Sequence, residues 1–300
     1  MRETKSKKVK QDKYSAVWLS HSSSGDFLKC PRLYYLKNIY KNENGRKINI
    51  VAPAMSLGST VHSVLEPLAK LPAEKRFDKN LLETYEENWQ KFGGKIGGFL
   101  NETQENEYKE KGKKMLENVI ANKGIFLNKT VKYYDGDFIP NIYLSEEDNI
   151  ILCGLVDWIE YLPQSDSLRV IDFKTGKNEE KEDSYQLPIY KILVESLQKR
   201  KVSSAAYWYL DKDAQLTLKD ADSISELALE GVREDLLEVG RDIKKRKENV
   251  EFGSHVQDNF LCKKGGCGHC QEFENIINKD ASVEYVGVGE YKQDLYLVKR

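Results

Sequence analysis

Apolar residues recur every three or four positions in several stretches of the chain, which is the spacing typical of amphipathic helices. One such stretch, 58–69, has an apolar face and places His62 and Glu66 one turn apart beside it. Further helices are expected from about 74 to 92, where a group of glycines then breaks the pattern, and over 108–120, 185–199 and 229–243.

Between 129 and 174 the pattern changes to short runs of Val, Ile, Tyr and Leu. Turn signals at Asp135-Gly136 and Gln164-Ser165-Asp166 divide these runs, which predicts a meander of three or four strands. A buried strand is expected over 205–210, and the Val/Tyr-rich C-terminal stretch is expected to be an edge strand. Strand, helix and strand in this order predict an α/β fold with a mixed central sheet flanked by helices.

The N-terminal region combines a basic tail with a short helix. Residues 1–13 carry six Lys or Arg and almost nothing apolar, which predicts a disordered tail. Ser23 and Asp26 then have the spacing of a capping box, so a helix is expected to end near Pro31, with Cys30 at its end.

Composition excludes some classes of protein. The 300 residues are 40% hydrophobic, with no apolar run near the ~20 residues that cross a bilayer and no apolar signal-peptide segment at the start. Five cysteines, an odd number, do not resemble a disulfide framework. We therefore expect a folded cytoplasmic protein without a membrane partner. Because the net charge is -1, a nucleic-acid partner would require a local basic groove.

The most informative chemistry lies in C-G-L-V-D-W-I-E-Y-L and the following L-R-V-I-D-F-K-T-G-K. On a strand, Asp172 and Lys174 project to the same side, whereas Phe173 faces the other way. Asp157 at the end of an adjacent strand would add a second carboxylate at this edge, giving the hard oxygen ligands that Mg²⁺ or Mn²⁺ prefers. A lysine beside such a pair can orient or help deprotonate water and offset charge on a phosphate. A surface ion pair is the ordinary alternative for any one of these residues.

Five motifs in order resemble the RecB-type nuclease domain of the PD-(D/E)XK superfamily, over roughly residues 20–275. They are a Cys-Pro after a Ser-rich helix start, a G-x-x-x-H helix, a G-x-x-D strand, a D-x-K-T-G strand and a Q-x-x-x-Y helix. The AddB nuclease domain and the small CRISPR-associated iron–sulfur exonucleases belong to the same group. The resemblance implies a restriction-endonuclease-like core with a helical insertion and a metal-clipped C-terminal region.

The resemblance also implies roles for individual residues. His62, Asp157 and Asp172 would bind the catalytic metal together with Phe173, and Lys174 would be the catalytic lysine. Gln186 and Tyr190 would support the site and contact nucleic acid. Glu66, one turn after His62, is expected to be an ordinary helix-surface charge, with support of the metal ligands as the alternative.

A glycine-rich loop, C-K-K-G-G-C-G-H-C, places Cys262, Cys267 and Cys270 close together, and Cys30 is the obvious fourth thiolate. Joining Cys30 to this loop would clip the two ends of the domain together. In the similar nucleases four cysteines hold a [4Fe-4S] cluster. Zn²⁺, bound by the same thiolates or with His269 replacing one, is the alternative. Cys153 is expected to be a small core residue.

These features predict a disordered tail over 1–14 and a single nuclease domain over 15–300. Within it we expect a helical part at about 58–123, a catalytic sheet core at about 128–250 and a cysteine region at 255–275. The expected activity is Mg²⁺- or Mn²⁺-dependent exonuclease action on single-stranded DNA or DNA ends, in repair, recombination, phage or CRISPR adaptation. Tyr34, Tyr35 and Tyr190 could stack on unpaired bases, although most tyrosines at these spacings are expected to lie in the core.

Two other functions compete with this one. The first is a DNA-end-binding module of the same fold, non-catalytic or activated by a partner such as a helicase or integrase. The second is a sequence-specific endonuclease, although no separate recognition domain is apparent. The chain has no helicase motif of the G-x-x-x-x-G-K-[ST] type, so any unwinding would come from another chain.

Overall fold

The computed structural model describes residues 12–134, 139–212, 217–218, 224–249, 255–262 and 266–299. The strands are β1 (Val17–Leu19), β2 (Ile48–Val51), β3 (Asn141–Ser145), β4 (Ile150–Cys153), β5 (Trp158–Leu162), β6 (Ser167–Lys174), β7 (Val202–Tyr209), β8 (Thr217–Leu218), β9 (Val283–Val288) and β10 (Asp294–Val298). The α-helices are α1 (His21–Lys29), α2 (Pro31–Tyr34), α3 (Pro53–Leu65), α4 (Leu81–Trp89), α5 (Glu102–Ala121), α6 (Gln186–Leu197), α7 (Glu226–Glu248) and α8 (Gln271–Ile277). The described residues include no helix that is both long and apolar enough to cross a membrane.

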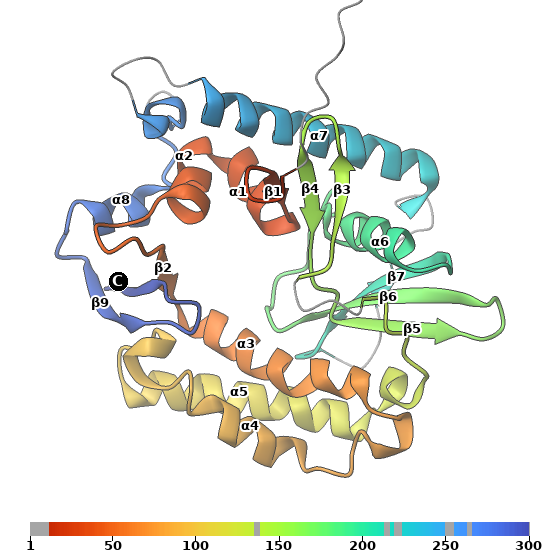
Figure 1. Ribbon diagram of the computed structural model, residues 1–300. Coiled ribbons are helices and arrows are strands. Elements are labelled where there is room, and N and C mark those ends of the chain that lie inside the picture. The colour runs from red at the N-terminus through yellow and green to blue at the C-terminus, as the bar shows by residue number, and fades with distance from the viewer. Residues whose placement is uncertain are drawn as a thin grey trace, which may run out of the picture.

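The central sheet has the strand order β5-β6-β7-β8. β5 and β6 form an antiparallel hairpin, and β7 returns parallel to β6 after the crossover helix α6. One face of the sheet packs on apolar residues of α6 and α7, whereas the other packs on α3, α4 and α5. Figure 1 shows this arrangement, with α6 and α7 above the sheet and α3 to α5 below it. The predicted mixed α/β sheet flanked by helices is therefore confirmed.

The predicted meander over 129–174 is wrong, because its strands belong to two sheets. β3 and β4 pair with each other, while β5 and β6 form part of the central sheet. The second edge of β4 is taken by β1, which lies parallel to it near the N-terminus. Such a pairing between distant segments leaves no local signal in the sequence, so β4 was expected to continue into the hairpin.

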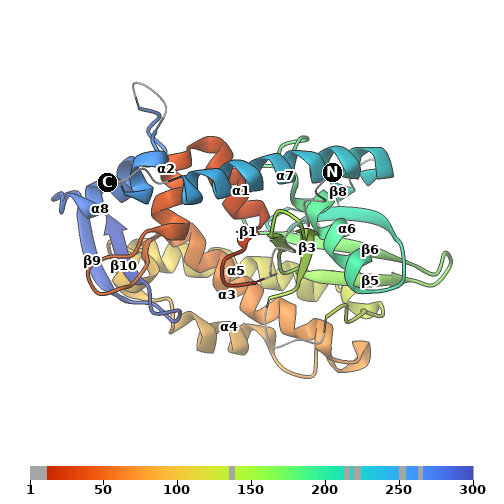
Figure 2. The same ribbon diagram turned by 45° about the horizontal axis from the view of Figure 1, so that its top comes forward.

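A third sheet joins the two ends of the chain. Its order is β2-β10-β9, with β10 parallel to β2 and antiparallel to β9. The predicted C-terminal edge strand is thus a hairpin, in which β9 forms the edge and β10 lies in the middle. Figures 1 and 2 place this sheet at the opposite side of the molecule from β5 and β6.

The helices expected over 58–69, 108–120, 185–199 and 229–243 correspond to α3, α5, α6 and α7. Two details are wrong. The capping box of α1 uses Ser20 and Ser23, because the Ser23 N–H donates to Ser20 Oγ at 3.1 Å and the Ser20 N–H donates to Ser23 Oγ at 2.8 Å. The helix expected from about 74 begins only at Leu81, where the Asn80 side chain caps it by accepting from Leu82 N.

Candidate active site and cysteine centre

The two motif aspartates meet where β5 begins and β6 ends. Trp158 pairs with Ile171 across the hairpin, so Asp157 and Asp172 lie beside each other at this edge of the sheet. Asp157 Oδ2 accepts a hydrogen bond of 2.7 Å from the Phe173 N–H. The Asp172 side chain is almost fully buried, and this burial, followed by the nearby Asp157 charge, raises the pKa of Asp172. The predicted convergence of the two carboxylates is therefore observed.

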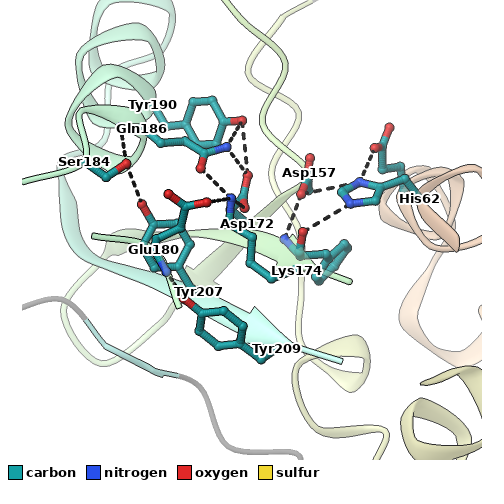
Figure 3. A network of polar contacts seen from close by, with 12 residues as sticks. His62, Asp157, Asp172, Lys174, Glu180, Ser184, Gln186, Tyr190, Tyr207 and Tyr209 are labelled. Carbon is teal, nitrogen blue, oxygen red and sulfur yellow. Dashed lines mark hydrogen bonds and ion pairs between the residues drawn. The ribbon is translucent and has the colours of Figure 1, made fainter. Parts of the chain in front are cut away.

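Lys174 is held by three oxygen acceptors, as Figure 3 shows. Its Nζ lies 2.9 Å from Asp172 Oδ2 and 3.0 Å from Glu180 Oε1, and it donates to Gln186 Oε1 at 2.6 Å. Burial opposes its charge, but Asp172 and then Glu180 outweigh this effect and raise the pKa of Lys174. The lysine is therefore an ammonium ion across the neutral pH range. This retains its ability to offset phosphate charge and leaves it a poor base for water.

The first turns of α6 carry the other two residues of this network. Gln186 Nε2 donates to Asp172 Oδ1 at 2.7 Å and to the Tyr190 hydroxyl at 3.1 Å. The Tyr190 hydroxyl donates in turn to Asp172 Oδ1 at 3.2 Å. Gly154 of the G-x-x-D motif allows this approach of α6, because a Cβ there would lie 3.1 Å from Leu193 Cδ1. The predicted position of the Q-x-x-x-Y pair at the same edge is thus observed.

His62 reaches the site from the opposite side, on α3. Its Nε2 donates to the Phe173 carbonyl oxygen at 3.1 Å, while its Nδ1 lies 2.9 Å from Glu66 Oε1 and 3.6 Å from Asp157 Oδ2. Burial opposes protonation, but hydrogen bonds to Asp157 and then Glu66 raise the pKa of His62 to about 10. Gly58 brings α3 close to the D-x-K-T-G turn, because a Cβ there would lie 3.3 Å from Thr175 Oγ1.

The nitrogen and oxygen atoms around His62 are suitable ligands for a divalent cation. His62, Glu66 and Asp157 each offer a ligand atom, and these atoms lie within 4.8 Å of one another. The imidazolium of His62 provides the positive charge that a bound cation would supply after displacing its proton. The side chain of Phe173 is buried in the core, so its contribution to the site is the main-chain carbonyl. Asp172 lies outside this group, since its oxygens face Lys174 and α6.

Two residues of this site were missed or undervalued by sequence reasoning. Glu66 was expected to be a surface charge, although it contacts His62 directly. Glu180 was not considered; its N–H donates to the Tyr209 hydroxyl at 2.8 Å, which holds its carboxylate beside Lys174. The only available signal was the acidic run N-E-E-K-E-D between the D-x-K-T-G and Q-x-x-x-Y motifs. His21, at the start of α1, is also near enough to Glu180 and Lys174 to respond to their charges.

A large cavity opens beside the metal-binding candidates. It has a volume of about 1320 Å³, and Glu66 and Asp157 are among its lining residues. Its lining combines basic, aromatic and aliphatic side chains, among them Lys70, Lys129, Lys132, Tyr133, Tyr134 and the exposed Leu155. Tyr34 and Tyr190 are both buried in the core, which was the favoured alternative to stacking on bases. The aromatic surface next to the site thus comes from Tyr133 and Tyr134.

The four predicted cysteines form a separate centre. Cys30, at the end of α1, lies with Cys262, Cys267 and Cys270, and the four Sγ atoms are within 4.8 Å of one another. Burial, followed by a hydrogen bond with Cys262, raises the pKa of Cys270 to about 12, so a cation is needed to stabilise four thiolates together. Cys153 is buried in β4, as expected of a core residue.

Comparison with known proteins agrees with this geometry. The family model for the PD-(D/E)XK nuclease superfamily matches residues 18–272. A comparison with curated proteins gives no significant match to the chain. The matched span includes both aspartates, the D-x-K lysine and the helix that carries His62. The chain therefore belongs to the PD-(D/E)XK nuclease superfamily.

Proposed function

We propose that the protein is a metal-dependent DNA exonuclease that hydrolyses phosphodiester bonds of single-stranded DNA or of DNA ends. Membership of the superfamily implies metal-dependent nuclease activity. The observation that carries the proposal is that the end of β6 brings together two sets of contacts, one between Asp157 and His62 and one among Asp172, Lys174 and Gln186. Repair, recombination, phage replication and CRISPR adaptation are all settings in which such an enzyme would act.

Each residue has a distinct part in the proposed reaction. His62, Glu66, Asp157 and the Phe173 carbonyl would hold Mg²⁺ or Mn²⁺, with Asp172 at the same edge. The chemistry that such a cation supplies when bound is a lower pKa for water and neutralisation of phosphate charge. The Lys174 ammonium would stabilise the negative charge of the phosphate. Gln186 holds the lysine and Asp172 in fixed positions relative to each other through its hydrogen bonds to both. The Tyr190 hydroxyl donates a hydrogen bond to Asp172 and so helps to hold its carboxylate in place.

The cavity beside the site supports unpaired DNA as the substrate. Lysines attract the sugar–phosphate backbone, and tyrosine rings offer stacking surfaces for bases that are not engaged in a duplex. Lys129, Tyr133 and Tyr134 line the same cavity as Glu66 and Asp157. A strand bound there would present a phosphate to the carboxylates without separate unwinding.

A DNA-end-binding module of the same fold, working with a helicase or integrase, is the alternative. Binding alone requires no buried aspartate beside a lysine, and burying charges is costly unless they are paired. Asp172 and Lys174 are both largely buried and are positioned by three further residues, Glu180, Gln186 and Tyr190. Because burying these two charges side by side is unfavourable and binding does not require it, the arrangement favours catalysis over simple binding.

We also propose that the four cysteines hold a metal centre. The family resemblance favours a [4Fe-4S] cluster. The sulfur spacing, which includes 3.3 Å between Cys262 and Cys267, favours the alternative of a single Zn²⁺ ion. A tetrahedral Zn²⁺ site with bonds of about 2.3 Å separates its sulfurs by about 3.8 Å. Iron, sulfide and zinc analysis of anaerobically purified protein, with its visible absorption spectrum, distinguishes the two.

The experiment that tests the nuclease proposal uses linear and circular single-stranded DNA of the same sequence, with linear duplex as a third substrate. Each is incubated with Mg²⁺, Mn²⁺ or EDTA. We expect metal-dependent shortening of the linear strand from a labelled end and an intact circle. Cleavage of the circle would identify an endonuclease. Intact DNA throughout, with tight binding to ends, would support the binding module instead.

A further inference from the structure

A second cavity lies apart from the metal site, at the turn that joins β9 and β10. It has a volume of about 680 Å³ and is formed by residues between 37 and 49 and by residues 291–293. Basic side chains dominate its lining: Lys37, Lys41, Arg46, Lys47 and Lys292. Among the described residues that form this lining none is acidic, although Glu43 and Glu290 adjoin it in the sequence. We call this cavity the basic hollow.

Three of these cations have no ion-pair partner among the described residues. Lys37 pairs with Asp26 at 2.7 Å, and Arg46 pairs with Asp294 at 3.1 Å. For Lys41, Lys47 and Lys292, the described part of the chain provides no ion-pair partner. Desolvation, followed by repulsion from Lys41, lowers the pKa of Lys47. An anion in the basic hollow would relieve this repulsion.

The basic hollow is built on paired strands. Asp294 pairs with Ile48 in the β2–β10 ladder, and the Asp294 N–H donates to the Lys47 carbonyl oxygen at 2.8 Å. The Asp294 carboxylate also accepts from Asn42 Nδ2 at 2.6 Å and is nearly fully buried. The two lining segments are therefore fixed relative to each other, and binding there would cost little ordering entropy.

We propose that the basic hollow binds the phosphate backbone of the nucleic-acid substrate, at a site separate from the catalytic centre. This inference rests on the proposed nuclease function for its choice of polyanion. The ring of Tyr291, which is 84% exposed, adds a stacking surface beside the lysines, a combination typical of nucleic-acid binding. Lysine contacts to phosphates provide affinity without sequence preference, as a nuclease of general substrates requires.

The basic hollow and His62 lie at opposite ends of the segment formed by β2 and α3. β2 leads directly into α3, and His62 lies nine residues after Pro53 on that helix, about 14 Å along its axis. DNA that contacts both sites must therefore extend beyond the nucleotide at the catalytic centre. The basic hollow would thus hold a part of the DNA that is not being cut.

The test is a triple variant, Lys41→Gln, Lys47→Gln and Lys292→Gln. It leaves the paired Lys37 and Arg46 in place, so no buried carboxylate loses its partner. Binding of a long single-stranded oligonucleotide is measured in EDTA over a series of salt concentrations. We expect the magnitude of the slope of log K against log salt to decrease by about 2, at about 0.7 for each lost phosphate contact. The affinity at low salt should be at least tenfold weaker than that of the native protein.

A matched control removes the same charge elsewhere, through Lys114→Gln, Lys245→Gln and Lys279→Gln. These lysines are exposed and lie outside both cavities, and Lys279 shares with Lys292 a left-handed backbone, with φ of 54° and 58°. Equal affinities and slopes for the two triple variants would overturn the proposal. Binding is measured in EDTA, where no hydrolysis occurs, so it is tested independently of cleavage. A protein that binds through the basic hollow but never cuts DNA when metal is present would contradict the nuclease function and leave the binding proposal intact.

Discussion

At the scale of single residues, Gln186 connects the two charged groups at the centre of the site. Its amide oxygen accepts from Lys174, while its amide nitrogen donates to Asp172 and to the Tyr190 hydroxyl. An amide offers an oxygen that accepts from an ammonium and an NH₂ group that donates to a carboxylate, so one side chain can satisfy both charges. Gln186 is therefore a positioning residue, which acts on the reaction through Lys174 and Asp172.

Replacing Gln186 with Ala should leave Lys174 and Asp172 with fewer constraints and lower cleavage by about 10- to 100-fold, the range seen when supporting residues of metal sites are lost. DNA affinity in EDTA should change much less, because the phosphate-binding lysines remain. Comparison of kcat with Kd for the variant checks this expectation. A loss confined to Kd would show that the glutamine only contacts DNA.

The residues that sequence could identify are those in local patterns. Asp172 and Lys174 alternate on one strand, and Gln186 and Tyr190 share one face of a helix, so their common direction is determined by periodicity. Glu180 lies in an irregular loop, where no periodicity fixes the direction of a side chain. Its place beside Lys174 depends on the Tyr209 hydroxyl, which comes from a strand that follows later in the chain.

At the scale of elements, α4 and α5 pack closely enough that one glycine decides their separation. Gly112 of α5 faces the buried Tyr85 of α4, and a Cβ at this position would lie 2.1 Å from the Tyr85 hydroxyl. Gly231 of α7, by contrast, has nothing within 4 Å of such a Cβ. The same substitution therefore has opposite consequences in the two helices.

We expect Gly231→Ala to stabilise the protein by about 0.5–1 kcal/mol, the usual helix-propensity gain. Gly112→Ala should lower the free energy of unfolding by about 1–3 kcal/mol, because overpacking against the Tyr85 ring outweighs that gain. Denaturant unfolding of both variants measures the difference. A stabilised Gly112→Ala protein would mean that the two helices are free to separate.

The positions and types of most helices and strands were predictable from the sequence, but the pairing of the strands into sheets was not. The helices with strong apolar periodicity were predicted near their observed positions, and the hairpin of β5 and β6 was expected from its turn signal. The assignment of β3 and β4 to a different sheet depends on β1, whose contact with β4 spans more than a hundred residues. Hydrophobic patterns carry no information about such distant pairing.

At the scale of the whole molecule, the cysteine centre and the β2–β10 ladder connect the two ends of the chain. Cys30 lies near the start of the described residues and Cys270 near their end, and both contribute to a small apolar cluster with Leu36 and Phe273. Arg32 adds an ion pair to Glu274, with 2.5 Å between Nε and Oε1. The cysteine part of this closure was expected, because three cysteines in one loop require a fourth ligand and Cys30 was the candidate, whereas the β2–β10 ladder was not predicted. The single nuclease domain over 15–300 stays a prediction, and residues 1–11 of the expected tail lie outside the described residues.

Replacing Cys267 with Ala should reduce bound metal and lower the melting temperature by more than about 5 °C, since metal binding is coupled to folding. Cys153→Ala is the control, because this buried cysteine lies in β4, away from the centre. Metal analysis and thermal unfolding of both proteins provide the comparison. If the Cys267 variant keeps its metal content and melting temperature, the four cysteines do not clip the chain.

The central claim is that Lys174 is required for phosphodiester hydrolysis. The most direct test compares Lys174→Ala with the control variant Lys177→Ala. Lys177 is an exposed lysine of the loop that follows β6, so its loss removes the same charge close to the site. The measurement is a time course on end-labelled single-stranded DNA with Mg²⁺ or Mn²⁺, together with binding in EDTA. We predict that Lys174→Ala abolishes cleavage and retains binding, while Lys177→Ala cuts like the native protein. Undiminished cleavage by Lys174→Ala would contradict the account.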